Sequence, residues 1–254
     1  MDELTRRQFG AVAGGTIAAF ALGGACRASE MRQGNGRITS RPRRDVRTTG
    51  SGSRVLGLGA KRDAVLRLPP DATGALPLLV LLHGAGGSGA GILRRLSQFS
   101  DEGGIAVLAP DSREETWDAI RHTIGIDVTF IDRALKIVFD TTAVDPERIA
   151  VGGFSDGASY AITLGLQNGD LFRRVLAYSP GFYVGGEAHG KPGFFISHGS
   201  ADQILPIDRC SRVIVPALQK RGYDVTFRQF DGGHDIPPNI ARAGMKWVAA
   251  SGSG

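Results

Sequence analysis

The run LPLLVLL at positions 76–82 contains no charged or hydrogen-bonding side chain. A strand with one face in water alternates apolar and polar residues, so a continuous apolar run is typical of a strand that is buried on both faces. Such strands belong to parallel sheets that have helices packed against both sides. This run therefore favours an α/β architecture.

The rest of the body repeats an alternation of short apolar runs and amphipathic segments. Strand–helix alternation predicts a mostly parallel central sheet with helices on both faces. No inserted segment is long enough to form a separate lid domain, so residues 54–254 are expected to form one domain. We expect strands at residues 54–59, 64–68, 76–82, 105–109, 148–152, 175–178, 193–197 and 224–230, and helices at residues 89–101, 126–139, 156–166, 208–221 and 238–249.

The positive charge of the chain is concentrated in one stretch. The 254 residues carry a net charge of +5, but residues 27–54 hold eight arginines against Glu30 and Asp45, a net +6, which leaves residues 55–254 at −1. Nucleic-acid enzymes usually carry basic charge on the folded domain, so nucleic acid is not an expected partner. The Arg-, Gly- and Ser-rich residues 27–53 predict a disordered basic linker, which would either be a plain spacer or attract anionic lipid head groups weakly.

The N-terminus has the pattern of an export signal. Arg6 and Arg7 precede an uncharged, weakly apolar stretch over residues 10–25. This arrangement resembles a twin-arginine signal, so we expect residues 1–26 to direct export to the periplasm, the cell envelope or the medium. The sequence LGGAC, ending at Cys26, also resembles a degenerate bacterial lipobox, although Gly23 stands where Leu is usual. Acylated Cys26 and the basic linker would then form a membrane-surface tether, and simple signal-peptidase cleavage is the alternative.

The strongest chemical signal is Gly153-Phe154-Ser155-Asp156-Gly157. It follows the apolar run RIAVG and opens a predicted helix, which is the context in which a G-x-S-x-G pattern forms a nucleophile elbow. The elbow strains the serine backbone and brings helix and strand so close that flanking side chains would clash. Ser155 is therefore the predicted nucleophile.

A second glycine-rich segment, His83-Gly84-Ala85-Gly86-Gly87, follows the run 76–82 directly. A turn at this place can direct backbone N–H groups at a developing oxyanion, with the N–H after the nucleophile as the second donor. We expect Ala85 and Asp156 to supply these donors, and a shift of one residue at Ala85 is left open. The alternative, a phosphate-binding loop, would require G-x-G-x-x-G or a Lys-Ser/Thr ending, and neither is present.

A serine nucleophile requires a base, for which five histidines compete. His234 follows the last predicted strand at the glycine turn Asp231-Gly232-Gly233, and the chain order Ser, Asp, His favours it. His83 belongs to the glycine-rich loop, whereas His122 and His189 lie in polar segments without a supporting pattern. His198 lies four residues from the expected acid and is interpreted as a structural turn histidine.

The acid should lie between the serine and the histidine and should follow a strand. Asp202, in HGSADQILPI after the predicted strand 193–197, has this position. Its role would be to orient the imidazole and stabilise the imidazolium. Asp208 and Asp231 are the alternatives, although each is more simply interpreted as a helix-start or surface carboxylate.

Together these segments resemble the α/β-hydrolase fold, in particular the lidless phospholipase/carboxylesterase and polyhydroxybutyrate-depolymerase-like esterases. The resemblance covers residues from about 54 to 250, and the motifs that carry it are LLHGAGG, APDSREETWD, GFSDGASYA, HGSADQILPI and FDGGHDIPP. One departure is Asp156, which stands where many polymer-active relatives have a small residue. The resemblance implies a single α/β-hydrolase catalytic domain over residues 54–254, and substrate-pocket roles for Trp117, Phe182 and Tyr183; ordinary core aromatics are the alternative.

The implied activity is hydrolysis of a small-molecule or polymer ester through an acyl-enzyme formed on Ser155. No metal or organic cofactor is expected, because no His, Cys or Asp cluster has ligand spacing and cysteine occurs only at Cys26 and Cys210. A lysophospholipase, thioesterase or peptidase with the same three residues is the first alternative. A non-catalytic surface binding protein on the same scaffold is the second.

Overall fold

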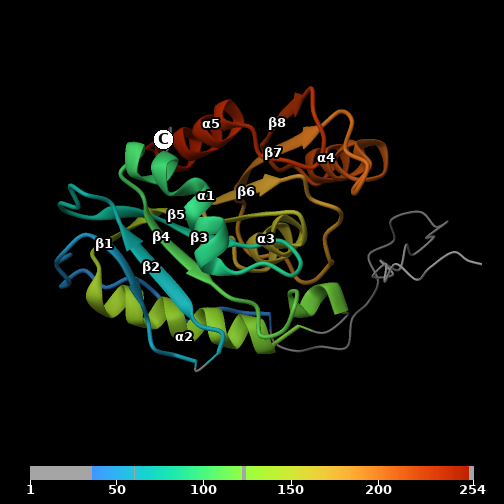
Figure 1. The fold of residues 1–254 in the computed structure, drawn as a ribbon. Helices are drawn as coiled ribbons and strands as arrows, with labels where there is room; N and C mark the ends of the chain where they lie inside the picture. Colours follow the sequence, from blue (N-terminus) through green and yellow to red (C-terminus); the bar gives the residue numbers. More distant parts are fainter. Residues whose placement is uncertain (1–35, 60, 122–123, 252–254) are drawn as a thin grey trace, which may run out of the picture.

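A computed structural model describes residues 36–251, with the exception of residues 60, 122 and 123 (Figure 1). These residues form one eight-stranded sheet with the strand order β1-β2-β4-β3-β5-β6-β7-β8. The pairs β1–β2 and β2–β4 are antiparallel, and every other neighbouring pair is parallel. The strands are β1 (Gly52–Val55), β2 (Ala64–Leu68), β3 (Leu76–Leu82), β4 (Ala106–Pro110), β5 (Val144–Phe154), β6 (Arg174–Tyr178), β7 (Gly193–Gly199) and β8 (Val225–Phe230).

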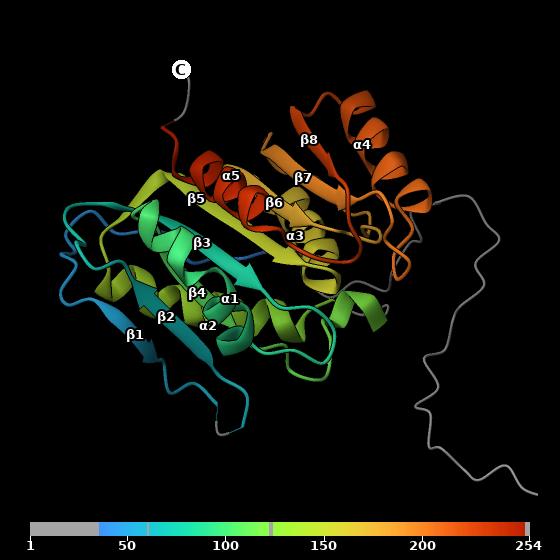
Figure 2. The ribbon, with the colours of Figure 1, turned by 45° about the horizontal axis from the view of Figure 1, so that its top comes forward.

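Helices cover both faces of the sheet (Figure 2). Helices α1 and α5 share one core with one face of the sheet, whereas α2, α3 and α4 share a second core with the other face. The mostly parallel α/β fold predicted from the sequence is therefore confirmed, and the described residues contain no separate lid domain. The helices are α1 (Gly89–Glu102), α2 (Ile126–Thr141), α3 (Asp156–Gln167), α4 (Ser211–Lys220) and α5 (Pro238–Ala249).

The strand β3 shows why the continuous apolar run was informative. Its side chains alternate between the two cores: Leu78 and Val80 pack with α2 and α3, whereas Leu79 packs with α1 and α5. All three are fully buried. The strand β5 begins at Val144, earlier than predicted, because its first residues include exposed polar side chains that carry no apolar pattern.

Residues 36–48, here called the strap, are ordered against the body. The side chain of Ile38 is 1% exposed and lies in the same core as α2 and α3. The prediction of a disordered linker over residues 27–53 is therefore wrong for the strap. Residues 27–35 and the expected export signal, Cys26 included, lie outside the described residues.

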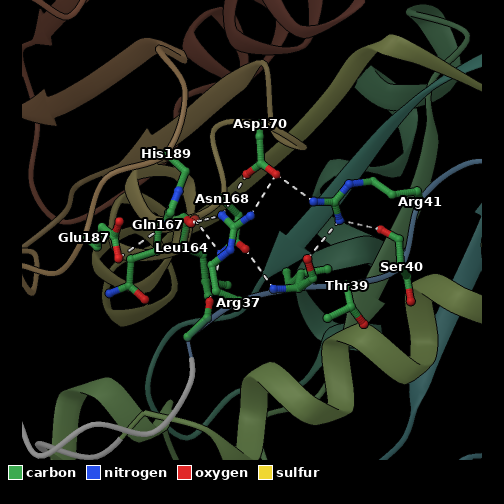
Figure 3. A network of polar contacts seen from close by, with 12 residues as sticks. Arg37, Thr39, Ser40, Arg41, Leu164, Gln167, Asn168, Asp170, Glu187 and His189 are labelled. Atoms are coloured by element: carbon green, nitrogen blue, oxygen red, sulfur yellow. Dashed lines mark hydrogen bonds and ion pairs between the residues drawn. The ribbon is translucent and has the colours of Figure 1, made fainter.

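Asn168 and Asp170, which follow α3, hold the strap (Figure 3). Asn168 accepts from the Ile38 N–H through Oδ1 over 2.8 Å. Asp170 accepts from both terminal nitrogens of Arg37 at 2.8 Å and from Arg41 at 2.7 Å. The hydrogen bond from Arg37 is the main cause that lowers the pKa of Asp170 to about 2.

A second attachment lies on α2. The carboxylate of Asp132 accepts from the backbone N–H groups of Thr39 and Ser40 at 3.1 and 2.8 Å, and from the Thr39 hydroxyl at 2.7 Å. The composition predicted a disordered linker, but the structure pairs Arg37 and Arg41 with Asp170, which lies far away in the chain. This pairing explains why a segment of linker-like composition is ordered.

Among the described residues, no helix is both long and apolar enough to cross a membrane.

Candidate active site

Ser155 lies between β5 and α3 in a backbone conformation that side chains rarely adopt. Its φ is 58° and its ψ is −121°, and α3 begins at the next residue, Asp156. A non-glycine residue with positive φ is strained, and such strain persists only where the surrounding structure holds the backbone. The Ser155 N–H donates to the carbonyl of Tyr178, at the end of β6, over 2.9 Å. The expected sharp strand–turn–helix is therefore present.

The glycines on either side of Ser155 allow close backbone packing. A Cβ atom at Gly153 would lie 2.5 Å from the carbonyl group of Gly157 and 2.7 Å from the carbonyl oxygen of Leu82. A Cβ atom at Gly157 would lie 2.4 Å from the same Leu82 oxygen. Because carbon contacts normally exceed about 3.5 Å, a side chain at either position would push α3 away from β3.

The glycine-rich loop after β3 lies directly beside this elbow. A Cβ atom at Gly84 would lie 3.3 Å from the Cβ of Ser155. Gly86 has a φ of 67°, and its N–H donates to the carbonyl of Glu115 over 2.8 Å. The Gly87 N–H donates to the Gly84 carbonyl over 3.0 Å. The amides of Gly86 and Gly87 are therefore engaged within the protein.

The two amides predicted as oxyanion donors remain available. Within the part of the chain that the structure describes, the Ala85 N–H has no backbone hydrogen-bond partner. Asp156 is the first residue of α3, so its N–H has no intrahelical acceptor. Since Gly86 is engaged, a one-residue shift from Ala85 toward it is disfavoured. The assignment of Ala85 and Asp156 stays a prediction.

The buried side chain of His83 connects the glycine-rich loop to the segment after β4. It is 1% exposed; its Nδ1 lies 2.7 Å from the Gly84 carbonyl oxygen, and its Nε2 lies 3.0 Å from the backbone N of Ser112. A carbonyl oxygen can only accept and a backbone N–H can only donate, so Nδ1 carries the proton and Nε2 is unprotonated. Burial lowers the pKa of His83, which favours this neutral form. His83 is thus a structural part of the loop, not a competing base.

Trp117 does not line a pocket, contrary to the expectation drawn from the family resemblance. It is 0% exposed, and its indole N–H donates to the carbonyl of His83 over 2.8 Å. Its ring stacks on Tyr160 with the centroids 5.2 Å apart. The alternative of a core aromatic is therefore correct, because the indole needs a buried partner for its N–H and finds one under the loop.

Phe182 and Tyr183 are half-buried and pack against the core that α2 and α3 share. The hydroxyl of Ser159, one helical turn after Ser155, accepts from the Gly181 N–H over 2.9 Å. This bond places the segment beside the first turn of α3. A pocket role for Phe182 and Tyr183 stays a prediction.

The turns after β7 and β8 are joined backbone to backbone. The N–H of Ser200 donates to the Phe230 carbonyl over 2.8 Å, and that of Ala201 donates to the Gly232 carbonyl over 2.9 Å. A Cβ atom at Gly199 would lie 2.2 Å from the carbonyl oxygen of Gly233 and 2.4 Å from that of Gly232. Only glycine at position 199 lets the two turns approach this closely.

This approach brings Asp202 and His234 together. The Nδ1 of His234 lies 2.6 Å from the Oδ2 of Asp202. The Asp202 side chain is fully buried, and its Oδ1 accepts from the N–H groups of Ile204 and Leu205 at 3.0 and 2.8 Å. The imidazole of His234 packs on the ring of Phe154, the neighbour of Ser155, with the centroids 4.7 Å apart. The three predicted residues thus follow the carboxyl ends of β5, β7 and β8, which belong to the parallel part of one sheet.

The alternative acids have other partners. Asp208 pairs with Arg212 on α4, and Asp231 accepts from the Ser200 hydroxyl over 3.2 Å. Across the described ranges, Asp202 is the one carboxylate that bonds to His234. The geometry therefore favours Asp202 over both alternatives.

Two of the candidate histidines from the sequence, His122 and His189, remain to be placed. His189 lies near Glu187, on the side of the molecule where Asp170 holds the strap (Figure 3). His122 is outside the described residues.

His198 has a position that the sequence did not reveal. Its Nε2 lies 3.2 Å from the Oδ2 of Asp202, and both side chains are fully buried. The sequence interpretation as a turn histidine covers its place in the fold but not this contact. The only signal was its position at the end of a strand, four residues before the expected acid.

The carboxylate of Asp156 is tied to the neighbouring loop, because its Oδ2 accepts from the Thr116 hydroxyl over 2.7 Å. A surface cavity of about 490 Å³ opens beside this contact, and it is lined by Arg62, Glu114, Glu115 and Thr116. Polar and charged groups therefore surround this side of the elbow.

Within the described ranges, no group of three or more His, Cys, Asp or Glu side chains is placed so that it could hold a metal ion. The expectation that the chemistry requires no cofactor stays a prediction.

Comparison with protein families matches residues 103–250 to the family described as phospholipase/carboxylesterase. Among curated proteins, the chain is 26% identical over 212 residues to a probable feruloyl esterase C of Aspergillus flavus, an alignment that covers 70% of this chain and 77% of the relative. It is 28% identical over 149 residues to an S-formylglutathione hydrolase of Bos taurus, which covers 48% of this chain and 53% of that protein.

Solved structures share the fold. A carboxylesterase of Bacillus cereus superposes with a TM-score of 0.59 at 21% identity, covering 75% of this chain and 94% of that one. An S-formylglutathione hydrolase of Staphylococcus aureus gives a TM-score of 0.62 at 18% identity, covering 81% and 100%. At these identities the likeness concerns the fold alone.

Proposed function

This chain belongs to the phospholipase/carboxylesterase family of α/β hydrolases and is a carboxylic ester hydrolase; we propose that it acts through Ser155, His234 and Asp202 and an acyl-enzyme intermediate. In the first step, the Ser155 hydroxyl attacks the ester carbonyl carbon while His234 takes the hydroxyl proton. The same imidazolium then donates that proton to the departing alkoxide, so that the alcohol leaves and the acyl group stays on Ser155.

In the second step, His234 takes a proton from water, and the resulting hydroxide attacks the acyl carbon. Collapse of this second tetrahedral intermediate breaks the bond to Ser155 and returns the proton to its oxygen. Asp202 holds the imidazole and stabilises the imidazolium in both steps. We propose that the backbone N–H groups of Ala85 and Asp156 bind the oxyanion in each intermediate. Both belong to segments beside Ser155, and neither donates to another backbone carbonyl among the described residues.

The observation that carries this proposal is the pairing of Asp202 with His234 over 2.6 Å at the sheet edge where Ser155 has its strained conformation. A serine without a base is a weak nucleophile, and a base without an orienting acid adopts more than one tautomer. The strained elbow and the histidine–carboxylate pair come from chain segments far apart, and their convergence supports a catalytic role.

For the substrate, we propose a carboxylic ester with an aromatic acyl or alcohol group. The support is the similarity to a probable feruloyl esterase C over 70% of this chain. Initial rates on methyl esters of hydroxycinnamic and short aliphatic acids would rank the acyl preference, and rates on phenyl and methyl esters of one acid would rank the alcohol preference. A higher rate on the methyl ester of a short aliphatic acid than on both the methyl hydroxycinnamates and the phenyl ester would contradict this part of the proposal.

The nucleophile is tested by Ser155→Ala, with Ser179→Ala as a matched control. Ser179 also has a positive φ of 50°, is fully buried, and its hydroxyl has no hydrogen-bond partner among the described residues. We expect Ser155→Ala to lower kcat by roughly 10⁶-fold and Ser179→Ala to leave it nearly unchanged. More than a tenth of the wild-type kcat in Ser155→Ala would remove this serine from the mechanism.

A thioesterase activity is the second candidate, because the chain is also similar to an S-formylglutathione hydrolase. The same nucleophile and base would attack a thioester carbonyl. Matched oxygen and sulfur esters of one acyl group separate the two activities. A kcat/KM that is higher for the thioester would favour the second candidate.

Export remains a proposal that rests on Arg6, Arg7 and Cys26. In cells that express the full chain, replacement of both arginines with lysine should retain the esterase inside, whereas Cys26→Ala should convert a membrane-bound form into a free one. Unchanged distribution in the lysine variant would contradict twin-arginine export, and unchanged distribution in Cys26→Ala would contradict acylation.

A further inference from the structure

Two histidines contact the same carboxylate oxygen. The Oδ2 of Asp202 lies 2.6 Å from the Nδ1 of His234 and 3.2 Å from the Nε2 of His198. The other oxygen, Oδ1, accepts from two backbone N–H groups, those of Ile204 and Leu205. The acid therefore has four donors around it, and His198 is the side-chain donor that no step of the proposed mechanism uses.

The contacts of His198 define its tautomer. Its Nε2 also lies 2.7 Å from the carbonyl oxygen of Leu205, so both neighbours of this nitrogen are acceptors and Nε2 carries the proton. Its Nδ1 lies 2.7 Å from the hydroxyl of Ser211, at the start of α4. Burial lowers the pKa of His198, which favours the neutral ring, so Nδ1 accepts from the Ser211 hydroxyl. Both ring nitrogens are held, and the ring orientation is fixed.

We propose that His198 is a positioning residue for the acid. Its Nε2–H donates to Asp202 Oδ2 and holds this oxygen in position to bond to His234. The same hydrogen bond stabilises part of the negative charge on Oδ2, which weakens the attraction between this oxygen and the imidazolium of His234. The side chain is fully buried, so it acts through Asp202 and not on substrate. This inference rests on the proposed function, and it makes α4, through Ser211, a support of the catalytic pair.

The titratable groups that face His198 are Asp202 and His234. Loss of the Nε2–H donor leaves Oδ2 with His234 as its one side-chain donor. The carboxylate then moves more freely, which lowers kcat, and it binds the protonated imidazole more tightly, which moves the acid limb of the kcat/KM profile to higher pH. A purely structural role would lower the folded fraction and leave the position of the limb unchanged.

The test compares His198→Leu with His198→Gln. Leucine removes the donor, whereas the glutamine amide places an N–H near the position of Nε2. We expect His198→Leu to lower kcat by about 100-fold with KM within about twofold, and to move the acid limb upward. We expect His198→Gln to keep most of the wild-type kcat and to have the acid limb of its kcat/KM profile at the wild-type pH. Thermal unfolding of each variant gives the folded fraction.

Ser197→Ala is the matched control, because Ser197 precedes His198 on β7, is fully buried, and its hydroxyl has no partner within the described residues. It should leave kcat and the limb unchanged. Ser211→Ala removes the donor to Nδ1 and should move the limb in the same direction as His198→Leu by a smaller amount. This variant decides the matter if His198→Leu does not fold.

A folded His198→Leu with the wild-type kcat and acid limb would overturn the inference. So would a loss of kcat that follows the folded fraction with an unmoved limb, or an unmoved limb in Ser211→Ala. Failure of the proposed function is recognised separately, by activity that survives in Ser155→Ala.

Discussion

The active-site edge and the strap are held to the same sheet-and-helix body by different forces. At the active-site edge, the backbone of one turn lies directly on another, as at Gly199 and Gly233, and the bond of His234 to the buried side chain of Asp202 completes the contact. Along the strap, one buried side chain, that of Ile38, is accompanied by ion pairs such as Arg37 with Asp170 that are about one-third exposed.

The difference concerns how precisely each region needs to be positioned. At Gly199 the neighbouring backbone lies so close that a Cβ atom would not fit, which leaves the two turns little freedom to move. A reaction that depends on the positions of single atoms benefits from such rigidity. Partly exposed ion pairs contribute little free energy and tolerate small shifts. We therefore expect substitutions at the active-site edge to change the rate, and substitutions along the strap to change stability with the rate preserved.

Among the substitutions that test this comparison of the two regions, the largest effect is expected for Asp202→Asn. The asparagine keeps the size of the side chain but presents an amide that does not stabilise the imidazolium, and a comparable change in a serine hydrolase lowers kcat by about 10⁴-fold. Steady-state kinetics on a nitrophenyl ester measures it. Asp208→Asn and Asp231→Asn are the matched controls and should keep kcat within about threefold, as expected for exposed positions. A greater loss in either control than in Asp202→Asn would move the acid role to that residue.

The next effect is expected for Gly199→Ala. Its Cβ would overlap the carbonyl oxygens of Gly232 and Gly233, so the turn that carries His234 is displaced from Asp202. A displacement of this kind costs about 100-fold in kcat. In Gly193→Ala, on the same strand, the new Cβ lies 3.5 Å from the Trp247 ring, an ordinary contact, so kcat should hold. Equal rates in the two variants would show that the backbone contact at Gly199 does not set the geometry.

Ile38→Ala tests the strap, where we expect a loss of stability without a loss of rate. Removal of a fully buried side chain costs about 2–5 kcal/mol in the free energy of unfolding, which urea titration measures. Since Ile38 packs with α2 and α3 and not at the active-site edge, kcat of the folded variant should equal that of wild type. Val55→Ala, at a position 65% exposed, is the control for stability. A loss of kcat without a loss of stability would contradict the separation of the two regions.

The smallest effect is expected for Asp170→Asn, and it depends on pH. Because its pKa in the folded state is about 2, against an ordinary value of 3.8, the ionised Asp170 stabilises the fold above about pH 4, and this contribution is lost as the pH falls toward 2. At neutral pH the variant should be less stable by no more than about 1 kcal/mol, since the pair is partly exposed.

Urea titrations between pH 7 and pH 2 follow this difference between wild type and Asp170→Asn. The difference should shrink below about pH 4, where carboxylates begin to take up protons. A difference that stays constant down to pH 2, or one larger than that of Ile38→Ala, would show that the ion pair dominates the attachment of the strap.

The fold was predictable because its signals are local and repeated. The apolar run 76–82 and the alternation of strands and helices report burial directly, and the structure confirms both. The strap was not predictable, because its order depends on Asp132, Asn168 and Asp170, which lie about a hundred residues away in the chain. Composition alone does not reveal such pairing.

The site divides in the same way. Gly153 and Gly157 mark the elbow because the backbone there excludes side chains, and that constraint is visible in the sequence. The burial of Trp117 under the glycine-rich loop and the contact of His198 with Asp202 depend on tertiary packing that no spacing encodes. Loop position therefore suggested a pocket for Trp117 where the structure has a core residue.

The central claim is that Ser155 is the activated nucleophile of an esterase. Labelling of the purified protein with a fluorophosphonate, followed by peptide mass spectrometry, tests it most directly, because the reagent forms a stable adduct with a serine whose proton an adjacent base removes. We predict one adduct, on Ser155, that disappears in Ser155→Ala and persists in Ser179→Ala. An adduct on another residue, or labelling that is undiminished in Ser155→Ala, would contradict the account.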